Sequence, residues 1–368
     1  MNVTLAFFTS RQNPRFAWFV DSLCRQTPPA ELAAMQIVFV DAKLWGIGPE
    51  VAARYLRAAG KFPLADPQWH DWKRREELAA VVGGRFDYLH IPPKPSAWQG
   101  PFRWTDRDWF AASNARNTAI IVAERPYLVC CDDLSCLSPM WIDQVRHAAT
   151  GYIVCGAYKK LLEMNVVHGR LESFKENPAG VDTRWDRGAD TGIVPWSGAG
   201  LFGCSFGAPV ELLTAIDGFD YYCDGQGAED YDMGIRLERA AGSGRIWYNR
   251  NMTTWESEEA HTEEPTLPRD SKMVPFDRLP DSLKADYPNG LMSDHVMLHS
   301  VMRETGRTLP LGRATPHSLA GLRDQWQREK LVPIPTEPAM DWRDGTPLTP
   351  PPPPAPTLPP ELTEEIDL

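Results

Sequence analysis

Short, continuous apolar runs alternate with amphipathic segments through the first two-thirds of the chain. The runs Val3 to Thr9, Gln36 to Val40 and Tyr127 to Cys131 have the length of buried strands and are rich in strand-forming residues. Between such runs, segments such as Asp108 to Ala123 repeat small and apolar residues at helical spacing. Strands that alternate with helices predict an α/β domain in which helices cover a central sheet.

Further elements follow along the chain, although from Leu309 onward only one more helix is expected. The segment Glu163 to Trp196 is the exception, because it shows neither period and carries several Gly and Pro residues, so we expect an irregular functional loop or lid there. Further strands are expected at Phe86 to Ile91, Tyr152 to Tyr158, Leu201 to Phe206 and Arg245 to Tyr248, and further helices at Pro14 to Arg25, Gly48 to Ala59, Trp72 to Val82, Ser138 to Thr150, from Pro209, Glu229 to Ala241 and Ser318 to Lys330.

One of the strands ends in two carboxylates. The apolar run from Tyr127 leads directly into Asp132 and Asp133. An open α/β sheet presents its ligands beyond the carboxyl ends of its strands, so both side chains stand where a ligand binds. Carboxylate oxygens suit Mg2+ or Mn2+, which take one or two protein carboxylates and complete their shell with phosphate and water. The pattern predicts, in outline, a site for a nucleoside diphosphate.

A second acidic pair opens a helix. The glycine-rich residues Gly218 to Ala228 precede Glu229 and Asp230, which stand in the first turn of the helix that runs to Ala241. Carboxylates suit the positive end of a helix dipole, and helix capping is the commoner reason for their presence there. Alternatively, one of them faces a cleft as a general base. Both interpretations remain open on this motif alone.

The ordered succession of these motifs resembles the GT-A glycosyltransferases. The nearest likenesses are the family 2 enzymes and the catalytic region of the β-1,4-galactosyltransferases. The resemblance covers roughly the first two-thirds of the chain, and the order of several motifs is more specific than any one of them. The residues that carry it are Asn114 to Asn117, the strand ending in Asp132 and Asp133, Phe202 to Ser205, Asp217 to Asp220, and Gly227 to Asp232.

The resemblance implies a Rossmann-like, three-layer domain with a mixed central sheet. It implies a transferase that moves a sugar from a nucleoside-diphosphate sugar, with a UDP-sugar as first choice, to an acceptor hydroxyl. It also implies Mn2+ or Mg2+ held by Asp133, Asp132 and a downstream His261, and Asp230 as general base with Glu229 beside it. The donor contacts that it implies come from Thr9, Asp41, Arg116, Asp132, Trp196 and Gly203.

Two departures limit what the resemblance implies. Similar enzymes usually carry Asp-x-Asp at the metal site, whereas this chain has Asp132, Asp133 and Leu134, so either carboxylate is a candidate ligand. The galactosyltransferases carry a tryptophan before the Glu-Asp pair where this chain has Gln226, so their acceptor preference does not apply. Glycan, protein, small-molecule and modified DNA-base acceptors all stay open. An inverting outcome is expected, with a retaining one as the alternative.

Several of these residues also fit ordinary structural roles. Asp41 either binds the donor or caps a turn, Arg116 either contacts the diphosphate or forms a surface ion pair, and His261 is either a metal ligand or a structural histidine. His295 and His299 would share one helix face, but they lack the adjacent Glu of a zincin motif. Rival functions are nucleotidyl transfer, which would favour a glycine-rich phosphate loop after the first strand, and a binding protein on a decayed transferase fold.

Composition narrows the choice of function further. The 368 residues carry a net charge of −11 and 43% hydrophobic residues, which allows a large core and argues against non-specific nucleic-acid binding. Seven cysteines without Cys-x-x-Cys pairs indicate buried thiols in a reducing compartment. The first residues lack the pattern of a signal peptide, and no apolar run has the length of a transmembrane helix, so we expect a cytoplasmic protein.

The chain is expected to have three parts. Residues 1–265 form the catalytic domain, and residues 266–330 form a helical extension packed on it. Residues 331–368 carry seven acids against one Arg and a run of five prolines, so this tail cannot form a core and is expected to be extended or disordered. The tail serves either as a spacer or as a docking segment for a partner.

Overall fold

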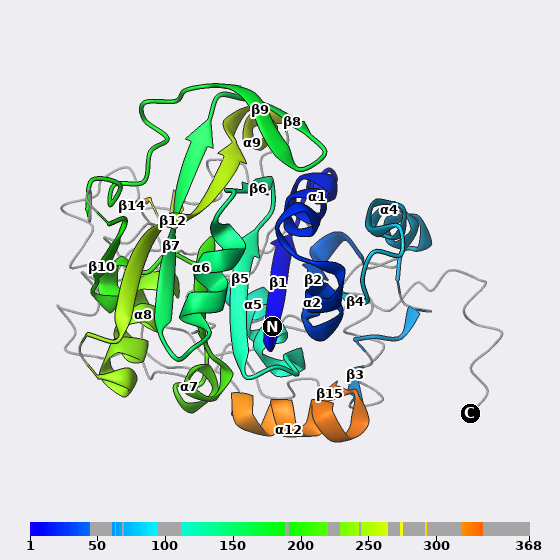
Figure 1. Ribbon diagram of the computed structural model, residues 1–368. Coiled ribbons are helices and arrows are strands. Elements are labelled where there is room, and N and C mark those ends of the chain that lie inside the picture. Colours follow the sequence, from blue (N-terminus) through cyan, green and yellow to red (C-terminus); the bar gives the residue numbers. More distant parts are fainter. Residues whose placement is uncertain are drawn as a thin grey trace.

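The computed structural model describes residues 1–44, 61–62, 64–67, 70–94, 112–187, 191–219, 229–242, 244–263, 273–274, 291–292 and 318–333. Most of these residues belong to one layered α/β body, in which a central sheet lies between two layers of helices (Figure 1). The fold class predicted from the sequence, a three-layer α/β domain with a mixed central sheet, is confirmed.

Nine strands of the described residues form the central sheet. They are β1 (Val3–Thr9), β2 (Gln36–Asp41), β4 (Tyr88–Ile91), β5 (Tyr127–Asp132), β6 (Ser135–Leu137), β7 (Ile153–Leu161), β10 (Ile193–Pro195), β11 (Ser205–Pro209) and β12 (Ile246–Ser257). Smaller strand pairs are β3 (Lys61–Phe62) with β15 (Val332–Pro333), β8 (Glu163–Val167) with β9 (Arg170–Lys175), and β13 (Met273–Val274) with β14 (Leu291–Met292). The helices are α1 (Phe16–Gln26), α2 (Pro29–Ala34), α4 (Trp72–Val82), α5 (Ala112–Val122), α6 (Trp141–Ala148), α7 (Val210–Ala215), α8 (Glu229–Ala241), α9 (Glu258–Glu263) and α12 (Leu319–Glu329).

The strand order brings several strand ends to one edge of the sheet. The order is β10-β12-β7-β11-β5-β1-β2-β4, with β6 beside β12. Strands β4, β2, β1 and β5 are parallel, whereas β11 is antiparallel to both β5 and β7, and β12 is parallel to β7. The carboxyl ends of β1, β5, β7 and β12 therefore point the same way, together with the amino end of β11. Ligands of open α/β sheets bind at such an edge.

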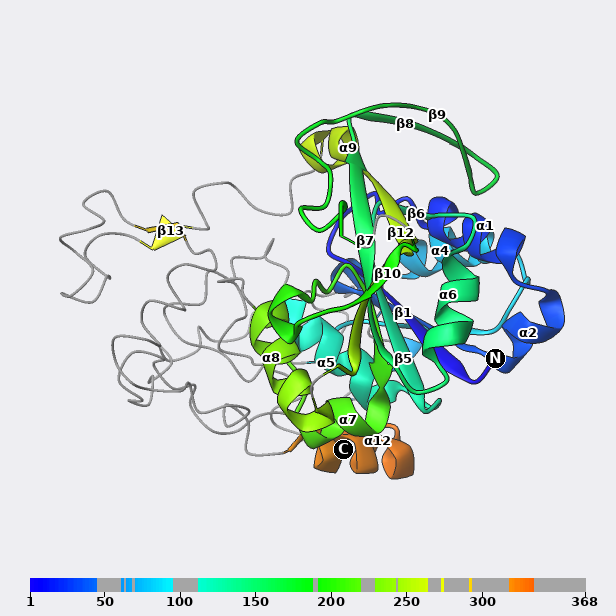
Figure 2. The same cartoon turned by 60° about the vertical axis from the view of Figure 1, so that its left-hand side comes forward.

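Neighbouring residues of the central strands pack on opposite faces of the sheet. On β1, Phe7 belongs to the apolar cluster with residues of α1 and α6, whereas Phe8 belongs to the cluster with residues of α5 and α8. On β5, Val129 and Cys130 divide in the same way. Figure 2 shows α5, α7, α8 and α12 on one side of the sheet and α1, α2 and α6 on the other. Because both faces are covered, these strands are continuous apolar runs in the sequence.

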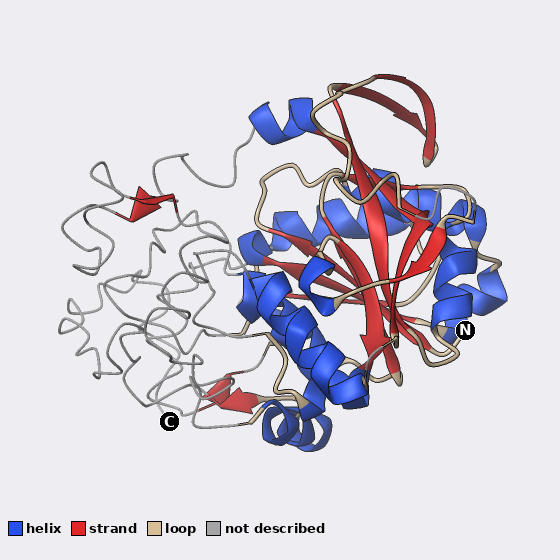
Figure 3. Cartoon of the chain, turned by 90° about the vertical axis from the view of Figure 1, so that its left-hand side faces the viewer, coloured by secondary structure: helices blue, strands red, loops and turns tan. Residues whose placement is uncertain are grey.

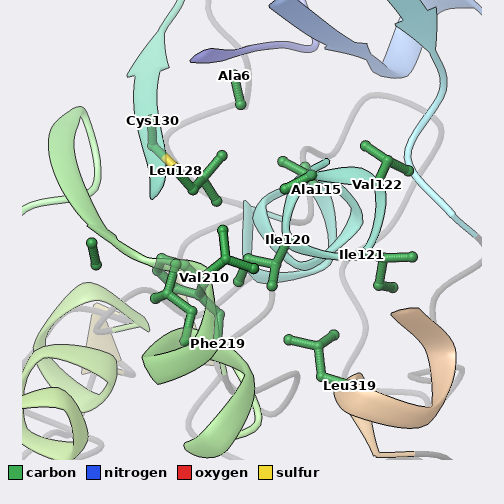
Figure 4. Packing of buried hydrophobic residues seen from close by; sticks show 14 of the residues in the cluster. Ala6, Ala115, Ile120, Ile121, Val122, Leu128, Cys130, Val210, Phe219 and Leu319 are labelled. Carbon is green, nitrogen blue, oxygen red and sulfur yellow. The ribbon is translucent and has the colours of Figure 1, made fainter. Parts of the chain in front are cut away.

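Helix α5 lies inside the body rather than on its surface. Its residues from Ser113 to Val122 are all buried. Figure 4 shows Ala115 and Ile120 in the apolar cluster, with Leu128 of the sheet on one side and Leu319 of α12 on the other. Arg323 of α12 also donates to the carbonyl oxygen of Ile120 at 2.9 Å. Helix α12 is therefore part of the same core, while the predicted boundary at residue 265 stays a prediction.

The predicted tail begins with two residues that belong to the folded body. Val332 is fully buried, and its strand β15 pairs with β3, opposite Phe62. The sequence placed Val332 in a proline-rich tail because one apolar residue carries no period of its own. Its side chain joins the cluster that contains Leu322 and Trp326 of α12. Folded structure therefore extends to Pro333, and residues 334–368 lie outside the described residues.

The expectation of an irregular segment from Glu163 to Trp196 is wrong over much of its length. Strands β8 and β9 form an antiparallel hairpin that projects beyond the sheet (Figures 1 and 3), and β10 adds to the edge of the sheet. Most hairpin residues are exposed on both faces, so the sequence shows no alternation of apolar and polar positions. The turn residues His168 and Gly169 both have positive φ, at 46° and 71°, as a two-residue hairpin turn of type I′ requires.

Part of this segment is also anchored firmly in the body. Arg184 is buried and pairs with Asp182 at 2.5 Å, and it donates to the carbonyl oxygen of Gly200 at 2.7 Å. The Arg184 guanidinium lies 4.1 Å from the ring centre of Phe202 and 4.7 Å from that of Tyr248. The predicted lid therefore includes a portion that the core holds in place.

Three boundaries near the candidate site also differ from the prediction. Strand β11 begins at Ser205 rather than at Leu201, because the amide of Leu201 bonds back to Gly198 in a tight turn. Strand β12 is twelve residues long, not four, because it pairs with β7 across an irregularity that interrupts the alternation. Helix α9, which carries His261, is absent from the predicted elements.

Several predictions fall on residues outside the described ones. They are the helix Gly48 to Ala59, the pair His295 and His299, and the glycine-rich loop from Asp220 to Ala228. Among the described residues, no helix combines the length and apolar character needed to span a membrane.

Candidate active site

A cavity of about 430 Å³ opens at the sheet edge where the strand ends meet. Both acidic pairs predicted from the sequence line it, although they are about a hundred residues apart in the chain. Asp132 and Asp133 come from the end of β5, and Glu229 and Asp230 from the first turn of α8. The remaining lining residues are Phe8, Ser10, Arg11, Arg116, Tyr158, Lys160, Phe202, Cys204, Glu256 and His261.

Arg116 links the two acidic pairs. Its side chain is only 4% exposed. Its Nη2 donates to both carboxylate oxygens of Asp132 at 3.3 Å, and its Nη1 donates to Glu229 at 3.0 Å and lies 3.5 Å from Asp230. The ring of Phe219 packs beneath the guanidinium, with 5.5 Å between the guanidinium carbon and the ring centre. Arg116 is therefore not a surface residue, and its charge is shared among three carboxylates.

Gly203 leaves the space that Arg116 and Asp230 occupy. A Cβ atom built on Gly203 would lie 2.6 Å from the Arg116 guanidinium carbon and closer still to Asp230 Oδ1. Real Cβ atoms essentially never approach other atoms so closely. The sequence analysis expected Gly203 to contact the donor, and the structure gives it a definite reason to lack a side chain.

Asp133 is held by a different group of residues. Thr9 Oγ1 donates to its Oδ2 at 2.7 Å, and Arg11 Nε donates to its Oδ1 at 3.2 Å. The same guanidinium donates through Nη2 to His261 Nδ1 at 2.7 Å. Since a guanidinium cannot accept, Nδ1 is the accepting nitrogen, and a neutral His261 carries its proton on Nε2. Arg11 is therefore the cation that joins Asp133 to His261. The predicted roles of Thr9 in donor binding and of His261 in metal binding stay predictions.

Acidic groups outnumber basic groups in the cavity lining. The lining holds five carboxyl groups but only Arg11, Arg116 and Lys160 as cations, a formal excess of two negative charges when all are ionised. Burial raises the pKa of Asp133 to about 6 and that of Glu256 to about 7. Burial also raises the pKa of Asp132, against the opposing charge of Arg116. The cations of the lining therefore do not fully compensate the charge of its carboxylates.

This donor set fits a divalent cation that a substrate helps to bind. Among the described residues, no group of three or more His, Cys, Asp or Glu side chains has the arrangement to hold a metal ion alone. Mg2+ needs only one or two protein carboxylates when substrate phosphates complete its shell. Asp132 is 32% exposed to the cavity and has only long hydrogen bonds, whereas Asp133 is 12% exposed and both its oxygens accept from Thr9 and Arg11. Asp132 is therefore the better placed ligand.

Asp41 does not line the cavity. It is fully buried at the end of β2, where it accepts from Arg74 at 2.7 Å and from His90 at 3.1 Å. Burial acts to raise the pKa of Asp41, but the bonds from His90 and Arg74 outweigh it and lower that pKa. Arg74 also donates to the carbonyl oxygen of Arg11 at 2.7 Å. Asp41 therefore supports the loop after β1 through Arg74, while its predicted contact with the donor stays a prediction.

Trp196 also lies outside the main cavity. Its indole nitrogen donates to the carbonyl oxygen of Gly200 at 3.2 Å. It lines a second, more open cavity of about 290 Å³, together with Pro195, Ser197, Glu238 and Gly244. The structure therefore separates Trp196 from the residues with which the sequence analysis grouped it.

Tyr158, Lys160 and Glu256 are among the lining groups that were not predicted as site residues. Tyr158 and Lys160 stand two residues apart on β7, and Glu256 stands opposite Lys160 on β12. Alternation along a strand predicts that Tyr158 and Lys160 share a face, but this signal becomes useful only when the partner strand is known. Glu256 was not predicted because the expected strand ended at Tyr248, whereas β12 continues to Ser257.

No family model and no curated protein matches this chain. Among solved structures, S. aureus TarS 1-349 is 12% identical with a TM-score of 0.43, over 70% of this chain and 60% of that one. The same TarS chain in complex with UDP-GlcNAc gives 13% and 0.42, over 70% and 59%. GalNAc-T7 with UDP, GalNAc and Mn2+ gives 12% and 0.44, over 70% and 45%. Similarities this low assign neither a substrate nor a residue to the present chain.

Proposed function

We propose that this chain is a metal-dependent glycosyltransferase of the GT-A type. It would move a sugar from a nucleoside-diphosphate sugar to an acceptor hydroxyl with inversion at the anomeric carbon. The observation that carries the proposal is the meeting of Asp132 and Glu229-Asp230 around the buried Arg116 at the ligand-binding edge of the sheet. Solved structures with UDP, UDP-GlcNAc and Mn2+ resemble this chain only distantly, so the proposal rests on its own cavity.

The donor half of the site is formed by the end of β5 and the loop after β1. Asp132 would hold a Mn2+ or Mg2+ ion, with Asp133 and His261 behind it. When bound, such an ion neutralises charge on the diphosphate as it leaves. Arg116 opposes the effect of burial on the pKa of Asp132 and fixes the direction of its side chain, and Thr9 and Arg11 do the same for Asp133.

The catalytic half of the site is the first turn of α8. Asp230 is 20% exposed to the cavity and Glu229 is 15% exposed. Arg116 donates to Glu229 at 3.0 Å, whereas its Nη1 lies 3.5 Å from Asp230. We therefore assign Asp230 as the base that takes the proton of the acceptor hydroxyl, and Glu229 as the residue that holds Arg116. Asp232 is excluded as the base because it is buried in an ion pair with Arg236 at 2.6 Å.

Thermal unfolding with nucleoside diphosphates tests this proposal. UDP and other nucleoside diphosphates should raise the melting temperature with Mn2+ present, and much less with EDTA. A ligand at a hundred times its dissociation constant adds about 2.7 kcal/mol of stability. Asp132→Asn should abolish the Mn2+-dependent part, whereas Asp143→Asn, an exposed acid on α6, should not. Equal stabilisation by UDP in Mn2+ and in EDTA would refute the metal role.

A further inference from the structure

Two adjacent lysines on β7 have opposite surroundings. Lys159 points away from the cavity, donates to Glu176 at 2.8 Å and lies near the rings of Phe174 and Trp185. Lys160 lines the cavity. The backbone amide of Lys160 bonds to the carbonyl oxygen of Gly180 at 2.8 Å, which fixes the strand at this point. Side chains of a strand alternate between its faces, so the pair divides into one outer and one inner cation.

The neighbours of Lys160 place it beside the acidic groups of the site. Lys160 stands directly opposite Glu256 in the register of β7 with β12. Its charge opposes the effect of burial on the pKa of Glu256 and on that of Asp132, although both pKa values stay raised. Tyr158, two residues before Lys160, also lines the cavity, with its ring centre 6.0 Å from that of Phe202. Lys160 is therefore close to the carboxylate that we assign to the metal.

The three cations of the cavity lining differ in what they already bind. Arg116 forms ion pairs with Asp132, Glu229 and Asp230, and Arg11 pairs with Asp133 and donates to His261. In the part of the chain that the structure describes, the Lys160 ammonium makes neither a hydrogen bond nor an ion pair. Its side chain is partly exposed to the cavity. Lys160 is thus the lining cation whose hydrogen bonds remain available to a ligand.

We propose that Lys160 binds phosphate oxygens in this cavity, and that these belong to the diphosphate of the donor. The assignment to the donor rests on the proposed function, whereas the binding of phosphate does not. An ammonium binds a phosphate group as a point charge. Because the cavity lining carries excess negative charge, an anion that binds there depends on each cation that is available to contact it. In the proposed reaction the acceptor oxygen bonds to the anomeric carbon and its proton passes to Asp230. The bond from that carbon to the phosphate oxygen breaks, and its electron pair stays on the diphosphate. The Lys160 ammonium stabilises the negative charge that the diphosphate gains.

Calorimetric titration with UDP, pyrophosphate and uridine, each with Mn2+, measures this role. Lys160→Met should weaken the binding of UDP and pyrophosphate by roughly ten- to a hundredfold, as expected for a lost hydrogen bond between charged groups. Uridine, which has no phosphate, should bind as it does to wild type. Lys160→Arg should restore most of the affinity. Lys159→Met is the matched control, because it removes the adjacent ammonium on the outer face and should leave all three affinities unchanged.

The possible outcomes separate the two proposals. If UDP binds Lys160→Met and wild type equally while inorganic phosphate binds only wild type, the donor assignment is overturned and the phosphate belongs to the acceptor. If wild type binds no UDP but binds pyrophosphate through Lys160, the phosphate site stands and the proposed function fails. If Lys160→Met, folded as judged by its melting temperature, binds UDP, pyrophosphate and phosphate as wild type does, the inference is wrong.

Discussion

Replacement of Arg116 by methionine removes a positive charge that three carboxylates share. The guanidinium lies between 3.0 and 3.5 Å from Asp132, Glu229 and Asp230, and the side chain is 4% exposed. Methionine has an unbranched side chain that fills much of the same space but offers no donor. The three carboxylates would therefore keep their buried charge with less compensation.

The size of the effect follows from the burial of these groups. Removal of one partner of a buried ion pair typically costs about 3 to 5 kcal/mol. Asp132 is 32% exposed, so water relieves part of the loss at that carboxylate. We expect Arg116→Met to lower the free energy of unfolding by about 4 kcal/mol, and the melting temperature by roughly 8 to 16 °C.

Denaturant and thermal unfolding at several pH values measure this loss. The loss should shrink as pH falls, because protonation of the carboxylates removes the uncompensated charge. Arg116→Lys keeps the charge but not the fork of donors, so it should fall between wild type and Arg116→Met. The control is Arg170→Met, since Arg170 is 63% exposed in its pair with Glu172 and should contribute at most about 1 kcal/mol. Wild-type stability of Arg116→Met, or a loss independent of pH, would refute the role of Arg116.

Three further predictions concern stability and activity. Burial raises the pKa of Glu256 from 4.5 to about 7, so the contribution of its protonated carboxyl to stability is full below pH 4.5 and is lost as pH rises through 7. Without added metal, denaturation curves should show that Glu256→Gln is about 3 kcal/mol more stable than wild type above pH 7 and equal to it near pH 4. Gly203→Ala should lower stability by about 1 to 3 kcal/mol and reduce sugar transfer, because its Cβ collides with Arg116 and Asp230; an unchanged melting temperature would contradict the crowding. Truncation after Pro333 should preserve the melting temperature. Truncation after Lys330 also removes the buried Val332 and should lower the free energy of unfolding by about 2 kcal/mol, as thermal unfolding of the two shortened chains would show.

The sequence predicts most accurately the elements whose side chains all lie in the same kind of environment. Strands β1 and β5 are covered on both faces, so every position is apolar, and their extents agree with prediction within a residue. Helix α8 spans Glu229–Ala241, the range that the sequence predicts. The exposed β8–β9 hairpin lacks any buried face, and its amino-acid pattern therefore carries no period that a sequence analysis detects.

The sequence predicts the acidic residues of the candidate site but not the contacts that join them. Asp132 and Asp133 follow an apolar strand and Glu229 and Asp230 open a helix, and these local signals are visible in the sequence. That Arg116 joins Asp132 to α8 depends on contacts between residues more than a hundred positions apart. The pairing of Asp41 with Arg74 was likewise not predictable, because Arg74 lies on α4 and the contact follows only from the tertiary fold.

The most direct measurement of the central claim compares wild type with Asp230→Asn in the release of UDP from a panel of UDP-sugars with Mn2+. Donor affinity is measured in parallel by calorimetry. Asparagine keeps the size of Asp230 but cannot take a proton at neutral pH, so donor binding should survive while turnover falls by roughly a hundred- to ten-thousandfold. Turnover of Asp230→Asn within a factor of about two of wild type, or the absence of UDP release from every donor that binds wild type, would contradict the assignment of this cavity as a glycosyltransferase active site with Asp230 as its base.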